Sequence, residues 1–140
     1  MRIGIALMIA LAAGACHKAE DATPPTPTER APDEKIAELT VDQVEHLLAD
    51  RACTPVDANG DPLRRKLGTL PGAVLLGDLD ALDKLPRDKA TQLVFYCANP
   101  SCSASHYAAE KARTAGYQRV AVMPAGIAGW VKAGKQTSQI

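Results

Sequence analysis

Three things are scarce in this sequence: aromatic residues, net charge and long apolar runs. Aromatic residues make up 4% of the 140 residues, so stacked aromatic platforms for bases or sugars are not expected. Lysine plus arginine number 16, as do aspartate plus glutamate, and this zero net charge argues against a nucleic-acid partner, which requires a basic surface. No apolar run reaches the roughly 18 residues that a membrane-spanning helix needs. Hydrophobic residues nevertheless make up 46%, which is enough for the core of one small domain.

The first 16 residues have the order of a secretory signal, with a positive charge, an apolar stretch and then small residues. Arg2 precedes the apolar stretch 3–13, and Cys16 follows directly after the small residues. This placement resembles a bacterial lipoprotein signal, in which the cysteine is lipidated and becomes the new N-terminus, although Ala13 stands where that family prefers leucine. We therefore expect a periplasmic domain in the cell envelope, held at the membrane only through lipidated Cys16. Secretion as a soluble protein is the alternative.

Residues 17–35 are polar and rich in proline, threonine and alanine. Proline lacks the amide that a helix needs and clashes with the preceding turn, so this segment is expected to be an extended, disordered linker. The folded domain is expected over residues 36–140.

Helical and extended patterns alternate along residues 36–140. Thr40 is placed to cap a helix with apolar residues at helical spacing, and Gln43 completes a capping box. The clearest strand is 93–96, whose continuous apolar character favours a parallel strand buried on both faces. The other expected strands are 54–57, 73–76 and 120–123, and the other expected helices are 79–85, 103–115 and 126–133. This alternation predicts an α/β domain with a small, mostly parallel central sheet flanked by helices.

Cys97 stands at the C-terminal end of the strand 93–96, and a short loop and a helix follow it. Ligands of open α/β sheets bind outside the carboxyl ends of the strands. A helix that begins near Ser103 would direct its free amides and its positive dipole end at the loop, and both favour a thiolate, the nucleophilic form of cysteine. The same amides would hold an anionic substrate. Position alone leaves a buried structural cysteine equally open.

Several segments together resemble a rhodanese-like domain over roughly residues 36–136. They are Val56-Asp57, Gly-Thr-Leu-Pro-Gly-Ala at 68–73, Leu-Val-Phe-Tyr-Cys at 93–97, 103–109, 115–120 and 125–130. The resemblance implies a three-layer α/β fold and a sulfurtransferase that needs no metal and no organic cofactor. Such an enzyme moves sulfane sulfur from a thiosulfate-like or persulfide donor to a thiol or cyanide acceptor. Cys97 falls on the family's active-site cysteine, which carries the sulfur as a persulfide. The loop that would bind the donor anion is Ala98, Asn99, Pro100, Ser101, Cys102 and Ser103.

The departures from the family's pattern concern charge. Many active rhodaneses carry a cation in or closing the loop, whereas this loop is uncharged. Asn59 occupies the place of the arginine in the family's Asp-x-Arg, so that arginine is expected to be missing. Asp57 has two possible roles. It either supports the active loop by accepting hydrogen bonds from the loop amides, or it ends a strand and caps a turn. Phosphatase chemistry is disfavoured because the residue six positions after Cys97 is Ser103. An arginine at that position could bind phosphate through two parallel hydrogen bonds, whereas serine cannot.

Cys102 lies five residues after Cys97 and has two interpretations. The simpler one, which we prefer, is a small residue in the place of an absent arginine. The other is a redox partner of Cys97, through a disulfide or by resolving a persulfide. A non-catalytic module for binding or redox sensing, using these two cysteines, is therefore the alternative to an enzyme. Cys53 is expected as a small buried hydrophobe, His106 as an exposed residue of a first helical turn, and Trp130 as part of the core.

Overall fold

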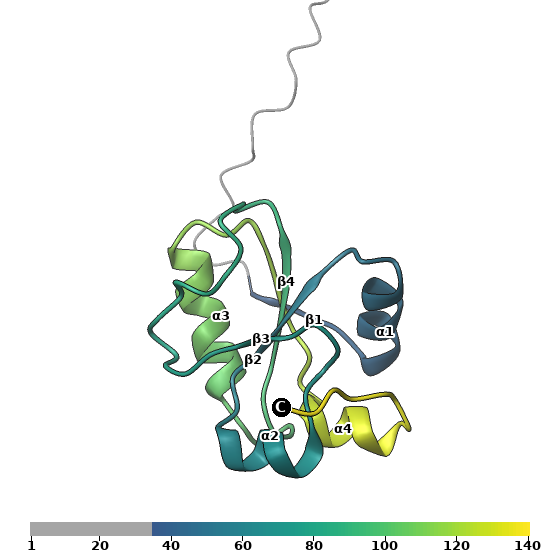
Figure 1. Cartoon of the computed structure of the whole chain (residues 1–140). Coiled ribbons are helices and arrows are strands. Elements are labelled where there is room, and N and C mark those ends of the chain that lie inside the picture. Colours follow the sequence, from purple (N-terminus) through teal and green to yellow (C-terminus); the bar gives the residue numbers. More distant parts are fainter. Residues whose placement is uncertain (1–34) are drawn as a thin grey trace, which may run out of the picture.

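The computed structural model describes residues 35–140, which form a parallel sheet of five strands and four helices (Figure 1). The strands are β1 (Ala37–Glu38), β2 (Thr54–Asp57), β3 (Val74–Leu75), β4 (Gln92–Tyr96) and β5 (Arg119–Val122), in the order β1-β5-β4-β2-β3. The helices are α1 (Val41–Ala49), α2 (Asp61–Leu67), α3 (Ala104–Thr114) and α4 (Gly126–Lys132). The predicted α/β fold with a parallel sheet is confirmed. The expected signal sequence 1–16, with Cys16, and the expected linker up to residue 34 lie outside the described residues.

Strand β4 occupies the centre of the sheet because it is apolar on both faces. It pairs in parallel with β2 and with β5, so that Phe95 lies opposite Val56 on one side and opposite Val122 on the other. The residues 93–96 are fully buried. Their continuous apolar character therefore reports burial on both faces, as the sequence indicated.

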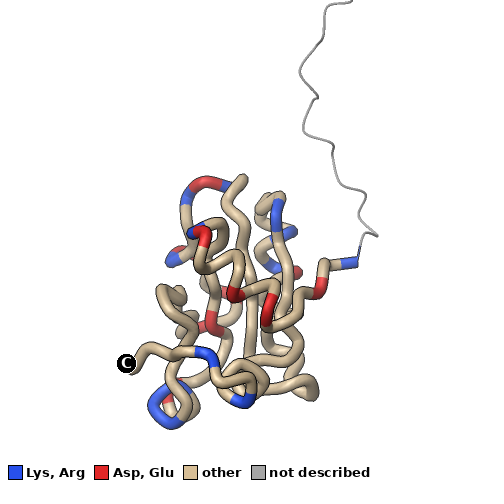
Figure 2. Tube along the Cα trace, turned by 90° about the vertical axis from the view of Figure 1, so that its right-hand side faces the viewer, with Lys and Arg blue, Asp and Glu red and all other residues tan. Residues whose placement is uncertain are grey.

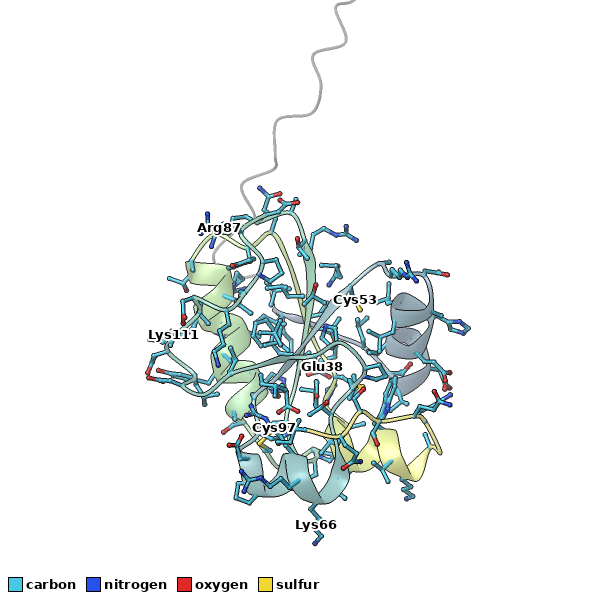
Figure 3. The ribbon with its side chains drawn as sticks, in the orientation of Figure 1. Glu38, Cys53, Lys66, Arg87, Cys97 and Lys111 are labelled. Carbon is cyan, nitrogen blue, oxygen red and sulfur yellow. A yellow bond between two sulfur atoms is a disulfide. The ribbon has the colours of Figure 1, made fainter. Side chains whose placement is uncertain are left out.

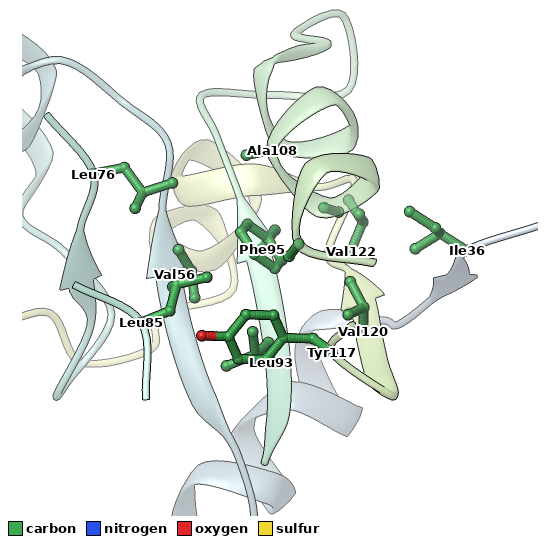
Figure 4. Packing of buried hydrophobic residues seen from close by; sticks show 12 residues of the cluster. Ile36, Val56, Leu76, Leu85, Leu93, Phe95, Ala108, Tyr117, Val120 and Val122 are labelled. Carbon is green, nitrogen blue, oxygen red and sulfur yellow. The ribbon is translucent and has the colours of Figure 1, made fainter. Parts of the chain in front are cut away.

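Helices cover both faces of the sheet and make three layers. On one face, α3 packs with three small residues, Ala108, Ala109 and Ala112, against a cluster that includes Phe95 (Figure 4). On the other face, α1, α2 and α4 pack against alternate strand residues; the buried members of that cluster are Val44, Leu70, Val94, Tyr96, Met123, Ile127 and Trp130. Each large apolar side chain that is fully buried stabilises the fold by about 1.5–3 kcal/mol. The expected place of Trp130 in the core is confirmed.

The start of α1 agrees with the sequence in detail. The Gln43 amide donates to Thr40 Oγ1 at 3.2 Å, and the Thr40 amide donates to Gln43 Oε1 at 2.8 Å. These two bonds satisfy amides that have no acceptor within the helix, so the capping box fixes where α1 begins. The short edge strand β1 directly before it was not expected from the sequence.

The helix expected over 79–85 is absent, and the prediction is wrong. Residues 77–91 form turns instead. Asp78 accepts the amide of Asp80 at 2.9 Å, and Asp88 accepts the amide of Ala90 at the same distance. Such local bonds from aspartate offer the backbone an alternative to a helix. The leucines of this segment still pack on the core, and Leu85 is buried. Their spacing therefore reflects burial of these side chains but not a helix.

Helix α2 was not expected, because its seven residues follow a turn signal and carry few apolar side chains. Its ends are nevertheless marked in the sequence. Pro62 lies in the first turn, where its missing amide costs nothing, and Gly68 ends the helix with φ of +79°. The helix follows β2 at the C-terminal edge of the sheet, which is the edge where Cys97 follows β4. No helix among residues 35–140 has both the length and the apolar character required to cross a membrane.

Candidate functional site

Cys97 directly follows the last residue of β4 and is 2% exposed. Because all five strands are parallel, the segments that follow β2, β3 and β5 reach the same edge of the sheet. The Ala58 amide donates to the carbonyl of Tyr96 at 2.9 Å, and the Met123 amide donates to that of Phe95 at 2.9 Å. Figure 3 shows Cys97 at this edge, and Cys53 lies toward the opposite one. The cysteine thus has the position that the sequence predicted.

The loop after Cys97 is a compact turn built on Asn99. The Asn99 side chain accepts the amide of Ser101 at 2.9 Å, and its carbonyl accepts the amide of Cys102 at 3.0 Å. Two of the loop amides expected to bind a donor anion are therefore used within the loop. Within residues 35–140, the amides of Ala98 and Asn99 make no hydrogen bond. Pro100 has no amide to offer.

Cys97 and Cys102 form a disulfide, with their Cα atoms 6.3 Å apart. This separation lies in the range of about 4.4–6.8 Å that disulfides require. The structure therefore pairs the two cysteines, as in the second interpretation above, and Cys102 is more than a small residue in the place of an arginine. The turn at Asn99 explains the pairing, because it folds the loop back and brings its two ends together.

The N-terminal turn of α3 faces the sulfur of Cys97. Ser105, which the sequence analysis did not single out, is buried and donates its hydroxyl to Cys97 Sγ at 3.4 Å. Ser103 precedes the helix, but its side chain makes no capping hydrogen bond, although a serine at this position can cap a helix. The amides of the first helical turn have no acceptor within the helix and carry the positive end of its dipole. The sequence contains no signal that separates Ser105 from the neighbouring serines.

The N-terminal turn of α4 supports the loop from the other side. The amides of Ile127 and Ala128 donate to the carbonyls of Cys97 and Ala98, at 2.8 and 3.0 Å. Gly126 has φ of +62°, and a Cβ there would lie 2.6 Å from the Cys97 carbonyl oxygen. Only glycine allows this close approach of the two backbones. The orientation of the loop base therefore depends on α4, a role that the sequence analysis did not assign.

Asp57 is fully buried and binds three groups, none of which belongs to the loop 97–102. It accepts the Asn59 amide at 2.7 Å, the Tyr96 hydroxyl at 2.6 Å and Arg64 Nε at 3.2 Å. Of the two expected roles, the structure has the one in which Asp57 ends a strand and caps a turn. It supports the site indirectly, because Tyr96 directly precedes Cys97.

Arg64 is a buried cation that the sequence analysis missed, and it comes from the unexpected helix α2. Besides Asp57, it binds the carbonyls of Asp57 and Leu76, at 3.1 and 2.8 Å, and the Asp61 carboxylate at 3.0 Å. These bonds tie the ends of β2 and β3 to α2. Position 59 thus has no arginine, but Arg64, five residues later, holds β2, β3 and α2 together. Burial and the neighbouring Asp57 charge raise the pKa of Tyr96, so its hydroxyl stays protonated and donates.

The remaining candidates lie apart from this site. Cys53 is half-buried, packs against the core on the α1 side, and has its pKa raised to about 11 by burial. His106 lies in the first turn of α3, as expected, with 45% of its side chain exposed, and its Nε2 lies 3.7 Å from a Glu38 carboxylate oxygen. Among residues 35–140, no group of three or more His, Cys, Asp or Glu side chains could hold a metal ion.

These features define an α/β domain with a buried cysteine at the C-terminal end of its central strand. A family model, the Rhodanese-like domain, matches residues 40–133. The chain therefore belongs to the rhodanese-like domain family, as its sequence segments indicated. A comparison with curated protein sequences finds no significant match.

Solved structures agree on the fold. A rhodanese-like domain from Anabaena is 21% identical and covers 76% of this chain and 81% of its own, with a TM-score of 0.63. A thiosulfate sulfurtransferase from Pseudomonas aeruginosa is 23% identical, with a TM-score of 0.60, and covers 74% of this chain but 21% of its own. A protein from Rhodopseudomonas palustris, described as of unknown function and a possible tyrosine phosphatase, is 24% identical over 73% of this chain and 84% of its own, with a TM-score of 0.62.

Proposed function

We propose that this protein is a sulfurtransferase in which Cys97 carries sulfane sulfur as a persulfide. The observation that carries the proposal is the position of Cys97, at the end of β4 and facing the N-terminal turn of α3. In the reduced protein, its thiolate attacks the outer sulfur of a donor such as thiosulfate. The bond between the two donor sulfurs breaks, sulfite leaves, and a persulfide remains on Cys97. A thiol, or cyanide in an assay, then accepts the outer sulfur.

The loop has no charged side chain, so hydroxyl and amide dipoles would have to stabilise the reacting sulfur. The Ser105 hydroxyl and the first-turn amides of α3 would favour the thiolate, and the amides of Ala98 and Asn99, which make no hydrogen bond within the described residues, would bind a donor anion. A site of this kind suits a persulfide monoanion, which carries less charge than the thiosulfate dianion.

The location that we propose for this reaction is the cell envelope. A lipid on Cys16 would hold the domain at the membrane, and residues 17–35 would serve as the spacer. The support is the order of residues 1–16 in the sequence.

The Cys97–Cys102 disulfide favours a second candidate function, a non-catalytic module that senses redox state. Such a module needs both cysteines and transfers no sulfur. A sulfurtransferase needs Cys97 for sulfur loading, whatever the fate of Cys102.

Intact mass spectrometry of the reduced full-length chain, after exposure to thiosulfate or to a small-molecule persulfide, tests the proposal. In Cys102→Ser, which leaves Cys97 as the one cysteine of the loop, the expected result is a gain of one sulfur atom that cyanide removes and that Cys97→Ser abolishes. Cys53→Ser in the same background is the matched control and should load normally. A Cys102→Ser chain that gains no sulfur from either donor, beside a wild type that only loses two hydrogens on oxidation, would favour the sensing module.

A further inference from the structure

We propose that Cys102 is the resolving thiol for a persulfide on Cys97, so that the domain releases the sulfane sulfur as sulfide and ends the turnover as a disulfide. This inference rests on the proposed function, because the persulfide must form first. It changes the product: the outer sulfur leaves reduced, and the protein then requires a thiol reductant.

The loop is built so that the two sulfurs can meet without rearrangement of the backbone. Its turn, held by the two bonds to Asn99, sets the Cα separation of 6.3 Å at which Cys97 and Cys102 are joined. The amides of α4 fix the carbonyls of Cys97 and Ala98, so the base of the loop is held as well. A loop with both ends supported in this way offers its second thiol to the first in each turnover.

The chemistry balances with one reductant. The Cys102 thiol loses its proton and its sulfur attacks Cys97 Sγ, the inner sulfur of the persulfide. The Cys97–Cys102 bond forms, the bond between the two persulfide sulfurs breaks, and the outer sulfur leaves with the proton as HS⁻. The outer sulfur gains two electrons, and the two cysteine sulfurs lose them. A dithiol then reduces the disulfide and becomes a disulfide itself.

Proximity makes this route faster than transfer to a dissolved thiol. Well-oriented groups within one molecule react as if at effective concentrations of about 10⁵ M or more, far above that of any free thiol. Because the loop holds Cys102 beside Cys97, the internal thiol should intercept the persulfide before an external acceptor arrives.

Exposure of the two cysteines determines which sulfur the reductant attacks. Cys97 is 2% exposed, whereas Cys102 is partly exposed at the mouth of the loop. An external thiolate can therefore reach Cys102 Sγ, and the Cys97 sulfur leaves as the thiolate that Ser105 and α3 stabilise. Reduction thus regenerates the nucleophile first, while the reductant is still attached to Cys102.

Cys53 supplies the internal control. It is the other cysteine among the described residues, it lies on the α1 side of the sheet, and its thiolate is disfavoured by burial. It is therefore not a competing resolving thiol. Replacing it should change neither the product nor the number of thiols lost in one turnover.

The test is a single turnover of the reduced full-length chain with thiosulfate, without oxygen or added thiol. Sulfite, sulfide and protein mass after alkylation are followed in wild type, Cys102→Ser and Cys53→Ser. We expect wild type and Cys53→Ser to release sulfite and sulfide in equal amounts and to lose two alkylatable thiols. Cys102→Ser should release sulfite, retain one extra sulfur on Cys97, and form sulfide at least about tenfold more slowly.

Two results would count against the inference, and they are distinguishable. Sulfite release with a persisting persulfide on wild-type Cys97 would show that Cys102 does not resolve it, and the proposed function would stand. Absence of sulfur loading in all three proteins, from thiosulfate and also from a small-molecule persulfide, would overturn the proposed function, and the inference with it.

Discussion

Ser105 donates its hydroxyl to the sulfur of Cys97 from within the first turn of α3. The donor is buried, so water does not replace it easily when it is removed. This contact is local and is independent of the buried ion pair between Arg64 and Asp57. The two features act on different properties of the protein, the first on reactivity and the second on stability, and single substitutions should separate them.

Ser105→Ala should slow the reaction of Cys97 without unfolding the protein. A hydrogen bond of this kind is worth about 1 kcal/mol, so alkylation of the reduced Cys97 at neutral pH should slow about fivefold. The measurement is the alkylation rate at this one site, followed by peptide mass spectrometry. Thr114→Ala, at the far end of α3, removes a hydroxyl that donates to Glu110 at 2.9 Å and should leave the rate unchanged. Equal rates in wild type and Ser105→Ala would show that the hydroxyl does not assist the thiolate.

Arg64→Met should destabilise the fold, because it leaves the Asp57 carboxylate buried without its cation. Breaking a buried pair from one side costs about 3–5 kcal/mol. Urea unfolding measures the loss, and the exposed Arg65→Met on the same helix should change stability by about 0.5 kcal/mol or less. Combining Arg64→Met with Asp57→Asn should cost less than the sum of the two single changes. Additive losses would mean that the two side chains do not act as a pair.

Among secondary-structure elements, sequence patterns predicted those whose signal is local and missed those fixed by distant contacts. The capping box at Thr40 and the continuously apolar β4 were read correctly. Leucine spacing at 79–85 predicted a helix, but aspartate turns formed there and the leucines still became buried. Helix α2 and Arg64 were missed because the helix is short, and its buried charge is explained by Asp57, seven residues earlier, and by the carbonyl of Leu76, twelve residues later.

The same limit applies to the candidate site. The sequence placed Cys97 and its loop correctly, because a strand, a cysteine and a helix follow one another within about 20 residues. It could not place Ser105 or Gly126 in the site. The role of Gly126 depends on a backbone that approaches from almost 30 positions earlier in the chain. It also preferred Cys102 as a small residue over its pairing with Cys97, since loop spacing alone does not specify the turn at Asn99.

Gly126→Ala should displace the loop from α4. The new methyl group meets the Cys97 and Ala98 carbonyls below 3 Å, in addition to strain from the positive φ. Gly134→Ala is the matched control, because Gly134 has φ of +72° but no atom within 4 Å of an added Cβ. We expect Gly134→Ala to cost about 1 kcal/mol and Gly126→Ala at least about 2 kcal/mol more, together with slower sulfur loading at Cys97. Equal losses of stability and loading in both variants would contradict a role for α4 in holding the loop.

For the molecule as a whole, charge provides little guidance to a partner. Acidic and basic residues are interspersed in the view of Figure 2, and the net charge is zero. Long-range steering of an anionic donor is therefore not expected, and binding depends on the short-range dipoles of the loop. Meeting a donor or a dithiol reductant then depends more on where the domain is held than on attraction from a distance.

The attachment that we propose for Cys16 makes the last prediction. In a bacterial host, the full-length chain should appear in the membrane fraction, should incorporate a fatty-acid label and should lack residues 1–15. Cys16→Ser should abolish both labelling and membrane association, because it removes the thiol that would carry the lipid. Cys53→Ser should behave as wild type, which excludes acylation of Cys53. An unlabelled wild-type chain in the soluble periplasmic fraction would favour plain secretion. A chain that keeps residues 1–16 and stays in the cytoplasm would contradict both, and would place the Cys97–Cys102 pair among reductants that keep it as two thiols.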